Sequence, residues 1–500
     1  MIHDNNKTDK KNIFNKAPQI PEEVADTIDA IKEKGFEAYI VGGCIRDLLL
    51  NKSPKDWDVA TNALPDEIEK IFPRTFCNNK YGMIGVTHEK DGVTKVVEVT
   101  TFRCDDIYSN KRHPDSVKYC KSVEEDLSRR DFTINAIAYE MNKNEFVDPS
   151  GGIGDIAQST IRAVGDAEER ISEDLLRMLR AIRIAVETGF KIDSSVEKAI
   201  VKNAKEIVKI SKERVRDEFT KILMSDQPMR GLLMLNDTGL LTHIIPDLKR
   251  GIGCDQNQAH KYDVFEHNLR TLQHSADKSY PFIIRLSSLL HDIAKPHTRE
   301  FSKEKNDWTF HSHEVLGAKL AKDIAEDLRY PREVVQDVRT LVRWHMFFSD
   351  TEQVTHSAVR RLVARVGEDK IWDLIKLRIC DRIGTGRPKE QPYRLRKFMA
   401  MIDEVMRDPI SVSMLKISGN DIMKLGEKPG PKIGFVLHAL LEEALDDTGK
   451  NTEEYLINRA KELLKLPADE LAKLGMSGKE KMEEEDAKII QSIRKKRFVD

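Results

Sequence analysis

Hydrophobic residues follow two different patterns along the chain, and the change comes near residue 155. Over residues 19–150 they gather in short β-prone runs, whereas beyond residue 155 they recur at helical spacing. The β-prone runs are AYIVG (38–42), MIGVTH (83–88), KVVEVTTF (95–102) and EFVDP (145–149). The pattern predicts an α+β fold, in which a small mixed-sheet head holds all the strands and the remainder is mostly helical.

Polar stretches divide the helical region and indicate where its helices end. They lie near residues 225–230, 246–262, 301–312, 385–393 and 426–434, and no clear internal repeat is visible. The final segment, KEKMEEEDAKIIQSIRKKRFVD (479–500), is charged and has few apolar positions, so we expect a solvated helix there. At 500 residues the chain is long enough for several domains.

The composition is that of a globular chain, with 40% hydrophobic and 33% charged residues and no apolar run that could span a bilayer. A formal net charge of −2 attracts no polyanion to the chain as a whole, so a nucleic-acid site would be a local basic patch. The first dozen residues are polar and lack a signal-peptide pattern, and we expect residues 1–18 to be disordered. No CxxC pair occurs, which is typical of a reduced cytosolic protein. The six cysteines are Cys44, Cys77, Cys104, Cys120, Cys254 and Cys380.

The segment GGCIRDLLLNKSPKDWD (42–58) carries the strongest chemical signal. A buried strand is expected to turn at Gly42-Gly43, where glycines let backbone N–H groups approach a triphosphate. Arg46 can add a forked, charge-assisted contact. Asp56 and Asp58 lie two residues apart at the start of an expected strand, where both carboxylates share one face and suit Mg²⁺. The alternative, a pair of solvated turn residues, does not account for the glycines and the arginine upstream.

Glu98 is a candidate third carboxylate, because it lies in the expected strand KVVEVTTF. An ordinary outward-facing strand glutamate fits the same pattern equally well, and the sequence leaves both alternatives open.

The segment EDLSRRDFTINAIAYE (125–140) places Arg129, Arg130 and Asp131 ahead of an apolar pattern of helical spacing. Positive charge at a helix start can hold a phosphate or a ribose. The alternative is that Asp131 is an N-cap and that the two arginines are solvated.

The segment RISEDLLRMLRAIRIAVE (170–187) predicts an amphipathic helix. Its polar face carries Glu173, Arg177, Arg180 and Arg183, with Asp174 at the border next to Arg177. A carboxylate and a guanidinium three residues apart could present an acceptor and a donor fork to a base edge. A solvated face with ordinary ion pairs is the alternative, although arginines without lysines favour recognition.

Together these motifs resemble the class II tRNA nucleotidyltransferase / bacterial poly(A) polymerase family, which includes the bacterial CCA-adding enzymes. The family pattern GGxVRD followed by DxD corresponds to GGCIRD and DWD. RRDFTINAIA matches without change at 129–138, EDLLRMLRAIR (173–183) fits EDxLRxLRAxR, and ISKERVRDEFTKIL (210–223) is similar to a fourth motif. The resemblance is strong over residues 35–235. Residues 102–119 match the family's flexible loop, which argues against an enzyme that adds only two cytidines.

The resemblance implies a role for each matching residue of the first motif. Gly43 and Arg46 would contact the triphosphate. Asp56 and Asp58 would be the catalytic residues and would hold Mg²⁺.

In the other motifs, the resemblance implies that Arg130 contacts the nucleotide. Asp174 and Arg177 would read the Watson–Crick edge of the incoming CTP or ATP, with Arg180 and Arg183 beside them. The protein, and not a nucleic-acid template, would then select the nucleotide.

Histidines cluster beyond residue 255, and the apolar run LLHDIAKP (289–296) contains an adjacent His-Asp pair. Such a pair, together with distant His and Asp residues, can enclose a divalent metal. The pattern resembles the HD phosphohydrolase superfamily, which implies the ligands His267, His291, Asp292 and Asp381. His313 and His345 would be second-metal ligands, and Lys295 could neutralise a phosphate. The alternative is a degenerate helical domain in which these residues pack or cap.

Residues 411–465 are similar to the family's C-terminal region. Gly430 to Gly434 open a helical pattern that could present N–H groups to an RNA phosphate, or could be a plain helix start.

The expected organisation has five parts. They are a disordered tail (1–18), a catalytic nucleotidyltransferase head (19–150), a helical neck that binds nucleotide and RNA (151–235), a helical HD domain (236–390) and a helical tRNA-binding tail (391–500).

The expected function is template-independent addition of C, C and A to tRNA 3′ ends from CTP and ATP with Mg²⁺. A second divalent metal (Mn, Ni, Fe or Mg) in the HD domain would bring phosphohydrolase activity. The enzyme is expected in the cytoplasm without a membrane partner, and its oligomeric state is not predicted. An A-adding enzyme or a poly(A) polymerase is the nearest alternative, and an HD metal-dependent phosphohydrolase is the alternative of another class. A non-catalytic RNA binder would gain nothing from paired carboxylates facing phosphates.

Overall fold

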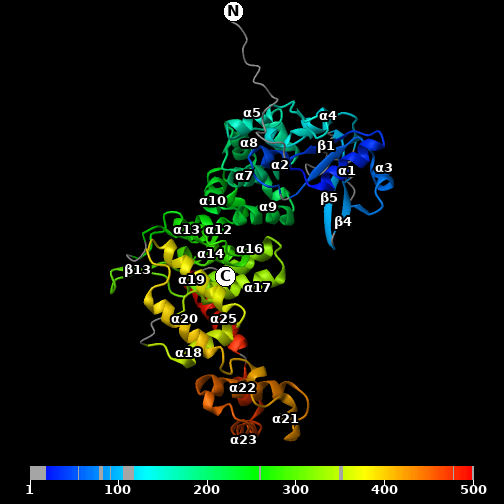
Figure 1. Ribbon diagram of the computed structural model, residues 1–500. Coiled ribbons are helices and arrows are strands. Elements are labelled where there is room, and N and C mark those ends of the chain that lie inside the picture. The colour runs from blue at the N-terminus through cyan, green and yellow to red at the C-terminus, as the bar shows by residue number, and fades with distance from the viewer. Residues whose placement is uncertain are drawn as a thin grey trace, which may run out of the picture. The chain divides into compact units, whose positions relative to one another are not determined.

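The computed structural model describes residues 19–54, 56–77, 83–90, 92–104, 118–257, 261–347, 353–476 and 478–497 (Figure 1). The expected tail (1–18) and most of the expected flexible loop (102–119) lie outside these residues. The chain forms two compact units. Unit 1 contains Met1–Ile222 with Leu233–His243, and unit 2 contains Leu223–Leu232 with Ile244–Asp500.

Unit 1 is built on a mixed seven-stranded sheet, as the sequence predicts. The strand order is β3-β4-β5-β2-β1-β8-β9, and β2 and β5 pair in parallel while the other neighbours are antiparallel. The strands are β1 (Ala38–Val41), β2 (Asp58–Thr61), β3 (Thr75–Cys77), β4 (Met83–Lys90), β5 (Val93–Thr101), β8 (Ala138–Glu140) and β9 (Glu145–Val147). A smaller ladder joins β6 (Arg103–Cys104) and β7 (Lys118–Tyr119).

Helix α1 (Glu22–Glu33) packs on the central strands through Val24, Ile28 and Ile31, which are fully buried. Burial of three such side chains contributes about 1.5–3 kcal/mol each to folding. The other helices of the sheet region are α2 (Gly43–Leu49), α3 (Pro65–Ile71), α4 (Val123–Ser128) and α5 (Gly152–Ala157).

The helix expected after Asp131 does not form. Residues Thr133–Asn135 make one 3₁₀ turn and Ala138–Glu140 form strand β8, which pairs with β1 and β9. All residues from 131 to 140 are buried, so apolar spacing does not mark a single buried face. This segment therefore offers no helix start that could bind a phosphate.

The expected helix over 170–187 is divided in two. Helix α6 (Ala167–Glu173) ends before Asp174, and α7 (Arg177–Thr188) begins three residues later. The predicted apolar face is confirmed, because Leu175, Leu179, Ile182 and Val186 are buried. The following helices are α8 (Ser194–Asn203), α9 (Lys212–Met224), α10 (Pro228–Asp237) and α11 (Leu241–Ile244).

Unit 2 is a helical assembly with one β-hairpin. Its first helices are α12 (Pro246–Lys249), α13 (Val264–Asp277), α14 (Phe282–Leu290), α15 (Lys295–Thr298), α16 (His313–Asp327) and α17 (Arg332–Trp344). The hairpin consists of β12 (Glu300–Ser302) and β13 (Asp307–Thr309). This hairpin and the short pair β10 (Thr160–Ile161) with β11 (Lys191–Ile192) correct the expectation that residues 19–150 hold every strand.

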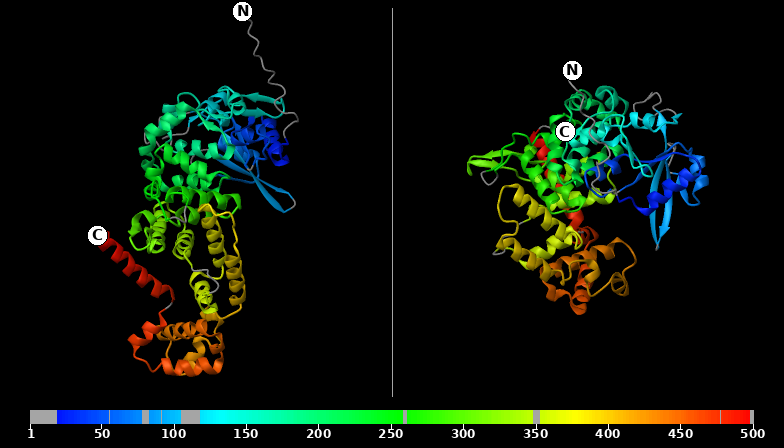
Figure 2. Two further views of the ribbon diagram at one scale, coloured as in Figure 1. Left: turned by 90° about the vertical axis from the view of Figure 1, so that its left-hand side faces the viewer. Right: turned by 45° about the horizontal axis from the view of Figure 1, so that its top comes forward.

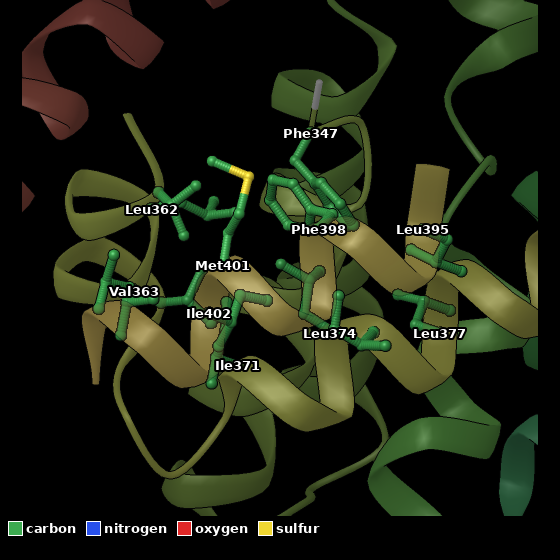
Figure 3. Close-up of a cluster of buried hydrophobic side chains, with 14 of the residues drawn as sticks. Phe347, Leu362, Val363, Ile371, Leu374, Leu377, Leu395, Phe398, Met401 and Ile402 are labelled. Atoms are coloured by element: carbon green, nitrogen blue, oxygen red, sulfur yellow. The ribbon is translucent and has the colours of Figure 1, made fainter. Parts of the chain in front are cut away.

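Three further helices, α18 (His356–Val366), α19 (Ile371–Gly384) and α20 (Tyr393–Val405), enclose a large apolar core. Figure 3 shows Leu374 of α19 beside Phe398 and Ile402 of α20, and Leu377 of α19 beside Leu395 of α20.

A separate core forms among the last helices, α21 (Gly419–Lys424), α22 (Pro431–Asp446), α23 (Glu453–Leu463) and α24 (Ala468–Gly475). Helix α25 (Gly478–Arg497), drawn in red in Figure 2, contacts α16 and α18. Asp486 of α25 is buried and lies 2.8 Å from Arg343 of α17. The final helix was expected to be solvated, but it is packed against α17 at this point.

Candidate functional site

The first motif forms a tight turn between a strand and a helix. Strand β1 ends at Val41, Gly42 has φ of +84°, and α2 begins at Gly43. A Cβ atom on Gly42 would lie 3.1 Å from Arg130 Nη1 and 3.4 Å from Asp58 Oδ2. Glycine is required here both for the left-handed backbone and for this close approach. The turn therefore brings backbone, a guanidinium and a carboxylate together.

Acidic side chains meet beside this turn. Asp58 opens β2, where it is the direct partner of Val41 on β1 and of Glu98 on β5. Directly paired residues project to the same face of a sheet, so Glu98 lies beside Asp58. Asp56 precedes the strand and is exposed.

The electrostatics of the three acids fit a cation. Burial and the Asp56 carboxylate raise the pKa of Asp58, against the opposing effect of Arg130. Burial, Asp58 and Asp56 all raise the pKa of Glu98. Asp58 and Glu98 thus each have a pKa raised by burial and by a neighbouring carboxylate, and a divalent ion bound by oxygen ligands would supply the positive charge that favours their ionised forms.

Arg130 is positioned by a buried carboxylate that sequence reasoning missed. Asp126 of α4 lies 2.7 Å from Arg129 Nη2 and 2.9 Å from Arg130 Nη2, and its own side chain is 1% exposed. Burial opposes ionisation of Asp126, but the two arginines outweigh it and lower its pKa. The carboxylate thus fixes Arg130 with one guanidinium nitrogen near Gly42 and Asp58.

Asp131 is not a helix N-cap but the centre of a buried network. Its Oδ2 lies 2.6 Å from Arg180 Nη2, and its Oδ1 accepts from Asn135 Nδ2 at 3.1 Å. Asn135 Oδ1 in turn accepts from Arg46 Nη1 at 2.9 Å, and Arg46 also pairs with Asp47. The network ties the first, second and third motifs together.

The remaining arginines of α7 are also paired. Arg177 is buried; it pairs with Glu173 and donates to the backbone oxygen of Arg170 at 2.6 Å. Arg183 Nε lies 2.7 Å from the buried carboxylate of Glu218.

Asp174 lies between α6 and α7 and is held from the fourth motif. Its Oδ2 is 2.7 Å from Arg214 Nη2, and its Oδ1 accepts from the backbone N–H of Leu176 at 3.0 Å. Asp174 and Arg177 were expected about one turn apart on a continuous helix, but Asp174 lies in the break between α6 and α7. Arg214 and Glu218 were missed as partners, although their segment resembles the family.

Unit 2 contains a second cluster, in which every side chain is buried. One nitrogen of His267, one of His291 and one oxygen of Asp381 lie within 4.8 Å of one another. The two Nε2 atoms are 3.0 Å apart, and His267 Nε2 lies 3.4 Å from Asp381 Oδ1. These residues come from α13, from the C-terminal end of α14 and from α19.

A neighbouring group contains Asp292, His313 and His345, again within 4.8 Å. Asp292 Oδ1 lies 3.2 Å from His313 Nε2, while its Oδ2 lies 3.2 Å from His267 Nε2. Asp292 therefore stands between the two ligand groups with one oxygen toward each, and it would contribute a carboxylate oxygen to an ion held by either group.

The imidazoles of this cluster are oriented for metal binding. The Nδ1 atoms of His291, His313 and His345 lie 2.7–2.9 Å from backbone oxygens of Ser288, Phe310 and Val342, so each ring directs Nε2 into the cluster. Such backbone bonds fix the tautomer of metal-binding histidines. Residues of this kind in this order fit one or two divalent ions.

Protonation inside the cluster is uneven. Burial, with His313 and His291 as neighbours, lowers the pKa of His345 to about 4 against the opposing effect of Asp292. Burial also opposes protonation of His291, but Asp292 and Asp381 outweigh it and raise the pKa of His291 to about 10. Lys295 Nζ lies 2.6 Å from Asp292 Oδ2 and donates to Gln256 Oε1 at 2.7 Å, a contact that the sequence did not indicate.

Three family models match the chain. "Poly A polymerase head domain" matches residues 38–162, "Probable RNA and SrmB- binding site of polymerase A" matches 189–252, and "HD domain" matches 264–404.

Curated relatives match over most of their length. The CCA-adding enzyme of Geobacillus sp. (strain WCH70) is 31% identical over 439 residues, which cover 86% of this chain and 95% of the relative. The CCA-adding enzyme of Lactiplantibacillus plantarum is 32% identical over 439 residues, covering 87% of this chain and 94% of the relative.

Solved structures agree with these relatives. The Bacillus stearothermophilus CCA-adding enzyme in complex with CTP aligns with a TM-score of 0.63 and 27% identity, covering 89% of this chain and 98% of that one. The Thermotoga maritima CCA-adding enzyme complexed with tRNA aligns with a TM-score of 0.52 at 20% identity and supports the fold. By sequence and by structure, the chain belongs to the CCA-adding enzyme family and is a nucleotidyltransferase with an HD domain.

Proposed function

We propose that this nucleotidyltransferase adds C, C and A to tRNA 3′ ends, using CTP and ATP without a nucleic-acid template. The observation that carries the proposal is the meeting of Asp58, Arg130 and the Gly42 turn, with Glu98 on the neighbouring strand. Relatives over most of the chain are named CCA-adding enzymes, and a solved neighbour holds CTP. ATP and tRNA are proposed as substrates because CCA-adding enzymes that share the fold have been solved in complex with them.

The residues of unit 1 have separate roles in this proposal. The turn at Gly42-Gly43 and Arg130 receive the triphosphate, and Asp126 holds Arg130 in place for it. Arg46 lies next to the same turn, where its guanidinium donates a hydrogen bond to Asn135. Asp56 and Asp58, with Glu98 beside them, would hold Mg²⁺, which when bound favours attack by a hydroxyl and departure of pyrophosphate.

Base selection is assigned to the junction of α6 and α7. Asp174 and Arg177 offer an acceptor and a donor fork, and Arg180 and Arg183 fix the helix through Asp131 and Glu218. Arg177 and Asp174 exchange their present partners, Glu173 and Arg214, for the base edge when nucleotide binds.

Substitution at this junction tests the assignment. In Arg177→Ala, we expect incorporation of GTP and UTP to approach that of CTP and ATP. Lys202→Ala is the matched control, because Lys202 is an exposed cation of the same helical region and pairs only at the surface with Glu168. Unchanged preference in Arg177→Ala would show that the base is read elsewhere.

The HD domain carries a second candidate function, a metal-dependent phosphohydrolase activity. Five buried His and Asp side chains around Asp292, with Lys295 next to it, support this activity. A bound divalent ion (Mn, Ni, Fe or Mg) would activate a water molecule toward a phosphoester. Release of phosphate from nucleotide phosphoesters should be lost in Asp292→Asn and kept in Asp58→Asn; the reverse would assign it to unit 1.

The described part of the chain contains no helix long and apolar enough to cross a membrane. Cys44, Cys104, Cys120, Cys254 and Cys380 are free thiols, and we infer a cytoplasmic location because thiols persist in a reducing compartment.

A further inference from the structure

Two cysteines and a glutamate meet in unit 1, outside the nucleotide site and the HD cluster. Strand β6 ends at Cys104, which pairs with Lys118 of β7, and Cys120 follows β7 directly. Helix α4 begins at Val123 and carries Glu125 in its first turn. Three separate backbone segments thus bring their side chains to one place.

The separations fit a tetrahedral metal site. One atom each of Cys104, Cys120 and Glu125 lie within 4.8 Å of one another, and Cys104 Sγ is 3.6 Å from Glu125 Oε2. Bonds of about 2.3 Å to sulfur and about 2.1 Å to oxygen around a tetrahedral Zn²⁺ ion place these two ligand atoms about 3.6 Å apart. The sulfur–oxygen distance therefore already suits a shared ion.

The exposure of the three side chains provides an entry path. Cys120 is 8% exposed, Cys104 is partly buried, and Glu125 is exposed. An ion can approach from the side of Glu125 and reach the thiols, and solvent can complete the coordination.

A thiophilic divalent cation binds cysteine as thiolate, displaces the thiol protons and neutralises the adjacent carboxylate.

We propose that Cys104, Cys120 and Glu125 bind a thiophilic divalent cation of the Zn²⁺ class, with water as the fourth ligand. The ion would fasten the β6–β7 ladder to α4. Asp126, the residue after Glu125, holds Arg129 and Arg130, so the ion would stiffen the segment that positions Arg130. This structural role is separate from the metals proposed for catalysis and for the HD domain.

The test is a Cd²⁺ titration of the full-length protein after chelation, followed by thiolate-to-metal charge-transfer absorption. The HD cluster supplies only His and Asp ligands and gives no such absorption. We expect one equivalent of thiolate-bound Cd²⁺, with loss of the signal in Cys104→Ser and in Cys120→Ser. Cys254→Ser, which removes another buried free thiol, is the matched control and should keep it.

Glu125→Gln provides a second variant that alters no thiol. Loss of this ligand should weaken Cd²⁺ binding at least about tenfold. Absence of the absorption from the wild-type protein, or its persistence in both serine variants, would overturn the proposal. So would a Cys104–Cys120 disulfide in the isolated protein that, once reduced, leaves thiols unable to bind Cd²⁺.

Discussion

The carboxylate of Asp131 lies 2.6 Å from the guanidinium of Arg180, and this pair joins the end of the RRD motif to helix α7. Asp131 is buried, whereas the Arg180 side chain keeps 36% of its exposure. Through Asn135 the same carboxylate is linked to Arg46, which follows the Gly42-Gly43 turn in α2. Asp131, which the sequence suggested as part of a phosphate site or as an N-cap, therefore links its own segment to helix α7.

Removal of the Asp131 carboxylate should destabilise unit 1. Asp131→Ala leaves Arg180 and Asn135 without their acceptor, and we expect a loss of about 2 kcal/mol, below the value for fully buried pairs because Arg180 can rehydrate. Urea unfolding followed by Trp57 fluorescence measures it, with Trp308, Trp344 and Trp372 replaced by phenylalanine. Asp217→Ala, which breaks an exposed pair with Arg216, should change stability by less than about 0.5 kcal/mol.

The contribution of Asp131 should depend on pH in one direction. Burial opposes its ionisation, but Arg180 and Asn135 outweigh burial and lower its pKa. A lowered folded-state pKa gives stability that is complete above the unfolded value of about 3.9 and is lost as the pH falls through the folded value. The stability difference between wild type and Asp131→Asn should be constant from about pH 6 to 8 and shrink below about pH 4. A difference that grows on acidification would contradict this.

Gly42→Ala should abolish nucleotide transfer. Alanine pays about 1 kcal/mol or more at this backbone conformation, and its Cβ would press on Arg130 and Asp58. Gly35→Ala is a close control, because Gly35 has φ of +86° and no atom lies within 4 Å of the position that the alanine Cβ would take. The two variants should be similarly destabilised, but only Gly42→Ala should lose activity. Equal activity in both would show that the close contact at Gly42 is unimportant.

Asp58→Asn should separate stability from function. Burial, with Asp56 nearby, raises the pKa of Asp58, so the folded state does not favour its charge, and removal of that charge should leave stability unchanged or slightly higher. Nucleotide transfer should fall below detection, because the metal site loses a ligand. Thermal unfolding and primer extension measure the two effects, and exposed Asp66→Asn should alter neither. Substantial transfer by Asp58→Asn would refute the metal assignment.

Metal binding to the HD cluster should release protons. Burial opposes protonation of His291, but Asp292 and Asp381 outweigh it and raise its pKa, so a metal that binds this ring competes with a proton. Affinity for Mn²⁺ should therefore fall on acidification, by about tenfold per pH unit for each proton released. Calorimetry in two buffers with different ionisation enthalpies counts the protons. Release of none at pH 7, or equal binding by Asp292→Asn, would contradict the assignment.

The sequence predicted the elements whose patterns are local. The turn after AYIV and the buried face of α7 follow from residue type and spacing. Strand β2 was also expected, but it begins at Asp58, and Asp56, which was expected on the same strand, precedes it. The helix expected after Asp131 was wrong because every residue from 131 to 140 is buried. In such a segment the spacing of apolar residues does not distinguish a buried helix face from a buried strand.

Partners of the site residues could not be predicted, because they come from distant segments. Asp126, Asn135, Arg214 and Glu218 contact the motif residues only once the chain has folded. The HD ligands illustrate the reverse case. Their spacing alone is uninformative, and the family resemblance located residues that the fold brings together.

The most direct test of the account uses a tRNA transcript that lacks its 3′ CCA, the full-length protein, Mg²⁺, and CTP and ATP separately and together, with products resolved to single nucleotides. The account predicts two additions with CTP alone and a third that requires ATP. A single A added only to a CC-ended tRNA, a long A ladder, or no extension at all would contradict it.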